Sequence, residues 1–151
     1  MVTQLAAHGL ALSLTAPWEA RIARREPTVA EERTFPVLHA ATFPLPEQRD
    51  DFGGGVTTRM RPADAFVVVF EYGPEAQGRP LFKRQGVPRV QPALFATNRL
   101  QRPLPGQLGC QQFFSQHGRA FCLYVVAGSR AALPRIITLV NSLLASLEIA
   151  P

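Results

Sequence analysis

Apolar residues near the C-terminus of the chain recur at spacings of three and four. The set consists of Leu133, Ile136, Ile137, Val140, Leu143, Leu144 and Leu147. Polar side chains fill much of the remaining positions, at Arg135, Thr138, Asn141, Ser142, Ser146 and Glu148. This spacing puts the apolar residues on one side of an α-helix, so it predicts an amphipathic helix over residues 133–147. We expect the apolar side of a helix of this length to pack against a flat apolar surface.

Other apolar patterns predict the strands that supply this surface. Residues 66–72 are apolar on both faces until Glu71, which is typical of a central strand. Residues 111–126 predict the two arms of a hairpin joined by a tight turn. Three further strands are expected: a half-buried alternating strand at 9–15, a charged edge strand at 19–26, and a strand at 35–45.

The remaining segments predict turns and loops. Residues 27–34 are polar and residues 47–55 are acidic and glycine-rich, so both are expected to be loops. Residues 56–65 are compatible with a short helix broken at Pro62 or with two turns. Residues 74–105 contain six prolines and little periodicity, and they predict a long surface connection with a short strand near residues 95–100.

These elements together predict an α+β fold, in which an antiparallel β-sheet packs against a C-terminal amphipathic helix. At 151 residues and 46% hydrophobic content, the chain is long enough to form one domain over residues 1–151 with its own core. It contains no internal repeat.

The order of these elements resembles the PsbP-like α/β sandwich superfamily, which includes LpqN-type lipoprotein domains and DcrB-like domains. The resemblance rests on a first strand closed by Pro-Trp at residues 14–18, an arginine-bearing second strand, a late hairpin and a final helix ending at Leu147. Ala16 stands where those proteins often have a glycine, and no lipobox cysteine precedes the domain. The resemblance implies a non-catalytic adaptor, assembly factor or chaperone, and it transfers no site residues.

Basic and acidic residues are unevenly distributed along the chain, whose net charge is +5. Residues 1–75 contain seven Arg and ten Asp or Glu, which gives −3, whereas residues 76–147 contain nine Arg or Lys and no acidic residue. This asymmetry favours an anionic partner or a self-complementary surface. The alternative is that the two halves interleave in one sheet and neutralise each other.

We therefore expect a non-catalytic protein-binding domain whose partner is an acidic protein surface or a neighbouring copy of the chain, because arginine pairs bidentately with carboxylates. The predicted partner-binding residues are Arg79, Lys83, Arg84, Arg89, Arg99 and Arg102. Two alternatives remain open. One is a carrier of an apolar, lipid-like ligand in a cavity between sheet and helix. The other is nucleic-acid binding through residues 79–102, with Phe82 and Phe95 stacking on bases.

Two free, mostly buried thiols are expected at Cys110 and Cys122, on the two arms of the hairpin. A three-residue loop at 116–118 would place them about 7–8 Å apart, too far for an unstrained disulfide, and a two-residue turn would place them on opposite faces. Free thiols suit a reducing compartment. No segment approaches the ~20 apolar residues of a membrane span. Residues 1–17 lack the positive region of a signal peptide, so we expect a cytoplasmic protein or a mature form whose leader was removed.

No catalytic, cofactor or metal site is predicted. The chain has no Gly-x-Ser-x-Gly elbow, and residues 127–129 are interpreted as the approach to the last helix. His8, His39 and His117 lack the spacing of zinc sites; His39 is interpreted as a core histidine and His117 as solvent-facing. The glycines at 53–55 resemble a phosphate-binding loop, but the lysine of such a loop is absent and a surface loop is favoured.

Overall fold

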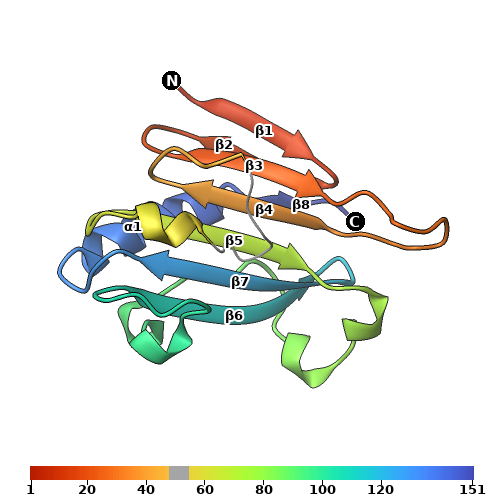
Figure 1. Cartoon of the computed structure of the whole chain (residues 1–151). Helices are drawn as coiled ribbons and strands as arrows, with labels where there is room; N and C mark the ends of the chain where they lie inside the picture. Colours follow the sequence, from red (N-terminus) through yellow and green to blue (C-terminus); the bar gives the residue numbers. More distant parts are fainter. Residues whose placement is uncertain (48–54) are drawn as a thin grey trace.

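Two antiparallel β-sheets and one α-helix make up the structure, a computed structural model that describes residues 1–47 and 55–151 (Figure 1). The larger sheet has the strand order β3 (Glu19–Arg24), β4 (Pro36–Ala41), β5 (Ala65–Glu71), β7 (Arg119–Ala127) and β6 (Leu108–Gln116). The smaller sheet has the order β1 (Thr3–Ala7), β2 (Leu10–Leu14) and β8 (Glu148–Ile149). The helix α1 covers Leu133–Ala145. The predicted α+β class is confirmed.

Strand β5 is the middle strand of the larger sheet, as its continuous apolar sequence predicts. Phe66, Val67, Val68 and Val69 all have 0% exposure. Val67 and Val69 belong to the core that lies under α1, while Phe66 and Val68 belong to a second core on the opposite face of the sheet. Both faces of β5 are covered, which is why its sequence does not alternate.

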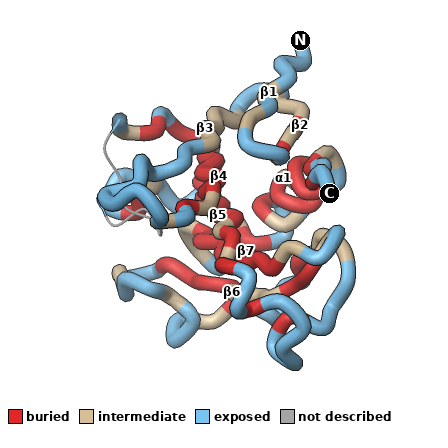
Figure 2. Tube along the Cα trace, turned by 90° about the vertical axis from the view of Figure 1, so that its right-hand side faces the viewer, coloured by how far each residue is buried: buried red, intermediate tan, exposed pale blue. Residues whose placement is uncertain are grey.

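The helix α1 packs on one face of the larger sheet, and buried residues lie between it and the strands (Figure 2). Its buried apolar residues are Leu133, Ile136, Val140, Leu143 and Leu144. One position departs from the predicted polar side, because Asn141 is only 8% exposed. Its Nδ2 donates to Val90 O at 3.0 Å and its Oδ1 accepts from Val90 N at 2.8 Å. The amide therefore binds the backbone of the long connection that precedes β6.

Two hairpins turn on a His-Gly pair. His8 and Gly9 join β1 to β2 with φ values of 52° and 80°, and His117 and Gly118 join β6 to β7 with φ values of 52° and 73°. Positive φ at both central residues is the signature of the type I′ turn, whose twist matches that of paired strands. The second position is glycine in both turns, which meets this requirement without steric cost.

The two-residue turn fixes the faces on which the cysteines lie. Gln116 is paired with Arg119, so Cys110 lies opposite Val125, and Cys122 lies opposite Phe113. These two pairs point to opposite faces of the sheet. Both thiols are free and buried, as the sequence predicts.

The smaller sheet is the part of the fold that the sequence pattern misses. The strand expected at 9–15 forms as β2, but it pairs with β1 and β8 and not with the larger sheet. Strand β1 is exposed or only partly buried along its length, and Leu5 is its single large apolar residue. It therefore shows no apolar alternation that would predict a strand.

The strands predicted at 19–26 and 35–45 are confirmed with shorter bounds. Strand β3 is an edge strand of the larger sheet, and the strand expected at 35–45 forms only over Pro36–Ala41. The segment 56–65 contains a one-turn 3-10 helix at Val56–Arg59, followed by a turn. The acidic, glycine-rich loop expected at 47–55 lies largely outside the described residues. No helix in the described ranges is long and apolar enough to span a membrane.

The long connection from 74 to 105 consists of short 3-10 turns. They cover Pro74–Ala76, Pro80–Phe82, Pro92–Leu94 and Thr97–Arg99. The prediction of a short strand near residues 95–100 is wrong, because backbone pairing there is limited to a single β-bridge between Ala96 and Gly109. Beyond that bridge the chain crosses over Gly109, where a Cβ atom would lie 2.7 Å from Arg99 O.

Arg119 joins the two sheets at the end where the His-Gly turns lie. Its Nε and one terminal nitrogen donate to the two carboxylate oxygens of Glu71, at 3.0 and 2.7 Å. Its guanidinium also donates to the backbone oxygens of Ala150, His8 and Gly9, at 3.0, 3.4 and 3.5 Å. This side chain thus links the smaller sheet to the larger one, beside the apolar packing of Leu10, Leu12 and Ile149 in the shared core.

Candidate docking surface and ligand cleft

The six predicted partner-binding residues are all exposed, and Lys83, Arg84, Arg89 and Arg99 lie beside the outer edge of β6. We call this set the basic strip: Arg79, Lys83, Arg84, Arg89, Arg99 and Arg102. They belong to the long connection, which is pinned to β6 at Ser115 and at Gly109. These two points are about 20 Å apart at about 3.3 Å per strand residue. In Figure 1 the yellow-green and blue-green coils of the connection lie at the two ends of β6.

The basic strip is a row rather than one cluster. Lys83 and Arg84 lie at the Ser115 end, where Ser115 Oγ donates to the backbone oxygen of Phe82 at 2.7 Å. Arg84 donates to Gln112 Oε1 at 3.3 Å, and Gln112 Nε2 donates to Arg89 O at 3.4 Å. These two arginines therefore flank a single residue of β6.

The other three residues of the basic strip lie before and after these positions in the connection. Arg79 follows the turn Pro74–Ala76 and donates from Nε to Glu75 O at 2.7 Å. Arg99 lies beside Gly109, at the other end of β6. Arg102 follows three residues later in the chain.

The connection covers the outer backbone of β6 at both ends of this row, at Ser115 and at Gly109. Ser115 N donates to Arg84 O at 2.7 Å, and Gly86 N donates to Ser115 O at 2.8 Å. At the other end, Ala96 and Gly109 exchange two hydrogen bonds of 2.9 Å. Covered edges do not template the addition of another strand. The surface therefore offers side chains to a partner, with the connection held in place beneath them.

Phe82 and Phe95 anchor the connection and do not face solvent. Phe82 is 5% exposed and stacks edge-on against Tyr72 and Phe113, at centroid distances of 5.2 and 5.6 Å. Phe95 is 4% exposed and lies in the core under α1. Buried rings cannot stack on bases, so the nucleic-acid alternative loses the two aromatic residues on which it depended.

The charges of the two halves of the chain remain largely separate. Among the described residues, the pairs Arg21–Glu19, Arg25–Glu32 and Arg61–Asp64 all lie within the first half. The pair Arg119–Glu71 is the one that joins the halves in the described ranges. The halves meet between β5 and β7, so the basic residues that follow residue 76 are not interleaved with acidic strands.

The thiols lie in surroundings that favour the neutral form. Burial raises the pKa of the Cys122 thiol to about 11, against a smaller opposite effect of the Gln111 amide, which donates to its sulfur at 3.4 Å. Burial also raises the pKa of the Cys110 thiol. Neither environment activates a thiolate.

The three histidines occupy different parts of the fold, one in the core and two on hairpin turns. His39 is 5% exposed and packs beside the Phe66 ring at 5.5 Å, which agrees with its interpretation as a core histidine. His8 and His117 are exposed on the two hairpin turns. Within residues 1–47 and 55–151, no three His, Cys, Asp or Glu side chains come together as a possible metal site. Of the three glycines that resemble a phosphate-binding loop and for which a surface loop is predicted, Gly53 and Gly54 lie outside the described residues.

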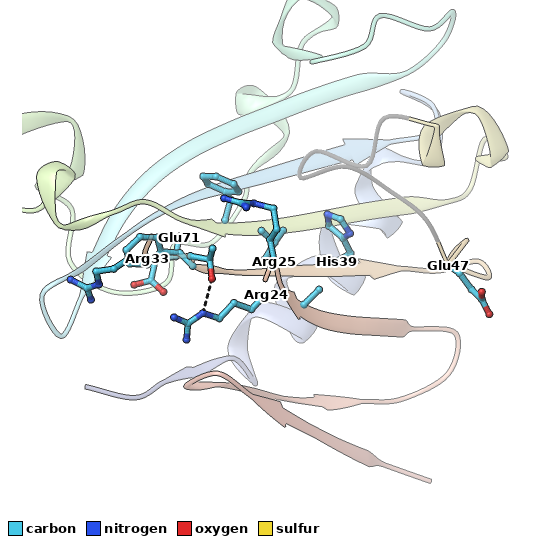
Figure 3. A pocket seen from close by; sticks show the side chains of 11 residues that line it. Arg24, Arg25, Arg33, His39, Glu47 and Glu71 are labelled. Carbon is cyan, nitrogen blue, oxygen red and sulfur yellow. Dashed lines mark hydrogen bonds between the residues drawn. The ribbon is translucent and has the colours of Figure 1, made fainter. Parts of the chain in front are cut away.

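A cleft of about 610 Å³ lies on the face of the larger sheet opposite α1 (Figure 3). Its floor includes Val37 on β4 and Phe70 on β5. Its wall includes Arg24, Arg33 and Phe35, which flank the loop between β3 and β4. The pairing of Arg24 with Pro36 brings these ends of the loop together.

No sequence pattern predicts this cleft. The sequence feature that could have indicated the cleft is a pair of short motifs, Arg24-Arg25 and Arg33-Thr34-Phe35, on either side of a polar loop. The motifs become neighbours only if the two flanking strands pair antiparallel, which their separate patterns do not specify.

A second, smaller cleft of about 410 Å³ lies along β1, β2 and β8, where Leu10 and Glu148 are among its lining residues. Neither cleft is lined by a residue of α1. The apolar carrier with a cavity between sheet and helix therefore stays a prediction.

No protein family, curated protein or solved structure matches the chain. What the chain does is therefore inferred from its own side chains.

Proposed function

We propose that the protein is a non-catalytic protein-binding domain that docks through the basic strip onto an acidic protein surface. The observation that carries this proposal is the set of six exposed basic side chains, four of them beside β6, in a segment from 76 to 147 without any acidic residue. A surface charged only for solubility mixes both signs. A row of one sign attracts a complementary surface and speeds association.

The chemistry of the strip favours carboxylates as its counterpart. Five of its six residues are arginine, whose planar guanidinium forms two parallel hydrogen bonds with a carboxylate. The backbone of β6 is hydrogen-bonded to the connection at Ser115 and at Gly109, which favours recognition through side chains over strand addition. An adaptor, an assembly component or a chaperone is the class of protein that fits such a surface.

A neighbouring copy of the chain is the second partner that the charges allow. Glu26 and Glu31 are exposed in the loop between β3 and β4, at the opposite edge of the larger sheet from β6. Contact between these two edges would be head-to-tail and would build chains of copies unless it closes into a ring.

We further propose that the fold is that of the PsbP-like α/β sandwich and that the protein works in a reducing compartment, as a cytoplasmic protein does. An antiparallel sheet covered by one C-terminal helix supports the first point. Two free buried thiols support the second.

The test is the binding of fluorescent poly-L-glutamate, measured by anisotropy at low and high salt. The docking variant carries Arg84→Glu with Arg89→Glu, because both residues flank Gln112. The control variant carries Arg130→Glu with Arg135→Glu, which are exposed beside and on α1 and give the same change in net charge. We expect binding by the wild type and the control at low salt, a loss of about tenfold in the docking variant, and convergence at high salt.

Equal losses in the two variants would contradict the proposal, because they would reflect net charge alone. Tighter binding of a mixed-sequence oligonucleotide, lost in the docking variant, would favour the nucleic-acid alternative. Sedimentation of the wild type alone tests the neighbouring copy, since a head-to-tail contact predicts association that rises with concentration and falls with salt.

A further inference from the structure

The cleft on the face opposite α1 has a charged end and an apolar floor. In Figure 3, Arg24, Arg33 and Glu71 lie at one end, where Arg25 points to the other side of the chain from Arg24; Glu47 lies at the other end, and His39 lies between the two ends. The cleft volume of about 610 Å³ falls in the range of pockets that hold small molecules. It is much larger than an inorganic anion requires.

The charges at the arginine end do not cancel. The Glu71 carboxylate is bound by Arg119 through two hydrogen bonds. Arg25 is paired with Glu32, and the hydrogen bonds from Arg25 and Thr28 lower the pKa of Glu32 to about 2. This pair therefore stays ionised and neutral overall.

Arg24 and Arg33 are different from Arg25. Neither has a carboxylate within ion-pair distance among residues 1–47 and 55–151. Two positive charges are therefore available at this end of the cleft.

Both guanidinium groups are held in place before any ligand binds. Arg24 Nε donates to Thr34 Oγ1 at 3.0 Å, and Thr34 is only 6% exposed. This contact orients the guanidinium and leaves its two terminal nitrogens for other acceptors. Arg33 lies over the Phe35 ring, with 5.5 Å between its Cζ and the ring centroid. Preorganised donors lower the entropy cost of binding an anion.

The remaining lining includes three large apolar side chains, beside the polar His39 and Glu47. Phe35, Val37 and Phe70 contribute rings and a branched side chain to the wall and floor. A hydrated inorganic ion gains nothing from such a surface, whereas a planar apolar group stacks on the rings and loses its contact with water.

We propose that this cleft binds a small organic anion, in which a carboxylate or phosphate group is attached to a planar apolar body. The anionic group pairs with Arg24 and Arg33, and the planar body lies against Phe35, Val37 and Phe70. The site is separate from the basic strip, because β3 and β6 are opposite edges of the larger sheet. It can be present whether or not the strip docks a partner.

Calorimetric titrations with naphthoate and with AMP test this proposal and distinguish a carboxylate from a phosphate ester. The cleft variant is Arg24→Gln with Arg33→Gln, and the matched control is Arg130→Gln with Arg135→Gln. Circular dichroism checks that both variants keep the fold. We expect saturable binding of at least one probe by the wild type and the control. We expect about tenfold weaker binding for each cleft arginine removed, since a hydrogen bond to a charged group contributes at least that factor.

Neutral naphthol supplies the second comparison, because it keeps the planar body and removes the anionic group. Binding of naphthoate well above that of naphthol supports the proposal, and so does AMP binding that is lost in the cleft variant. Absence of saturable binding of both anions at millimolar concentration would overturn it. Equal affinity in the cleft variant and the control would also overturn it.

Discussion

Arg119 contacts four residues through one guanidinium group: the Glu71 carboxylate on β5 and the backbone oxygens of His8, Gly9 and Ala150. The ion pair is well shielded, with side-chain exposures of 17% for Arg119 and 7% for Glu71. Removing one partner of such a pair strongly destabilises the folded protein, because the remaining charge is shielded from water and loses its hydrogen bonds.

Replacing Arg119 tests this role. We expect Arg119→Met to lower the free energy of unfolding by about 3–5 kcal/mol, as measured by denaturant titration. The exposed Arg130→Met is the control and should change it by less than about 0.5 kcal/mol. The double variant with Glu71→Gln should cost clearly less than the sum of the two single variants. Additive losses would show that the pair is not coupled.

The Cys122 thiol makes stability depend on pH in the alkaline range. Burial raises its pKa from 9.0 to about 11, so the folded protein keeps this proton at pH values where the unfolded chain loses it. The contribution of this raised pKa to the free energy of unfolding is complete below pH 9.0, and it is lost as the pH rises towards 11. We expect the free energy of unfolding of the wild type to fall in this window more steeply than that of Cys122→Ala, by about 1 kcal/mol per pH unit. Parallel pH profiles would contradict the burial effect.

At the scale of elements, the long connection is held by α1 as well as by β6. Asn141 makes two hydrogen bonds with the backbone of Val90, one residue after Arg89 of the basic strip. The amide thus serves the backbone of Val90 as a neighbouring strand would. Without it, a buried N–H and a buried C=O lose their partners.

Asn141→Ala should therefore lower the free energy of unfolding by about 2 kcal/mol and speed tryptic cleavage after Arg89. Ser142→Ala, one residue further and exposed, is the matched control and should behave as the wild type. Mass spectrometry of early digestion products locates the cut. Unchanged cleavage in Asn141→Ala would mean that the connection is held by β6 alone.

Features that the sequence predicts depend on residues within one segment, whereas features that it misses depend on contacts with distant residues. The stripe of α1 and the two-sided burial of β5 are periodic over one segment, so the sequence predicts both. Asn141 carries no such signal, because its burial depends on Val90, which lies 51 residues away. Strand β1 exists because β2 offers it an edge, and its own residues remain mostly exposed.

At the scale of the whole molecule, the basic strip and the cleft with Arg24 and Arg33 lie at opposite edges of the larger sheet. The basic strip was predicted from sequence because its residues lie in one acid-free segment. The cleft was not, because Arg24 and Arg33 come together only when β3 and β4 pair. Composition therefore indicates a basic surface, while pairing of strands decides where a small cleft forms.

Docking through the basic strip is tested most directly by mapping where an acidic chain touches the protein. The measurement is a titration of ¹⁵N-labelled protein with poly-L-glutamate, followed by amide chemical shifts at low salt. We predict that the first and largest shifts occur in residues 79–102 and along β6, and that they vanish in the Arg84→Glu, Arg89→Glu variant. Shifts that appear first on α1, or at Arg24 and Arg33, with the basic strip unchanged, would contradict the account.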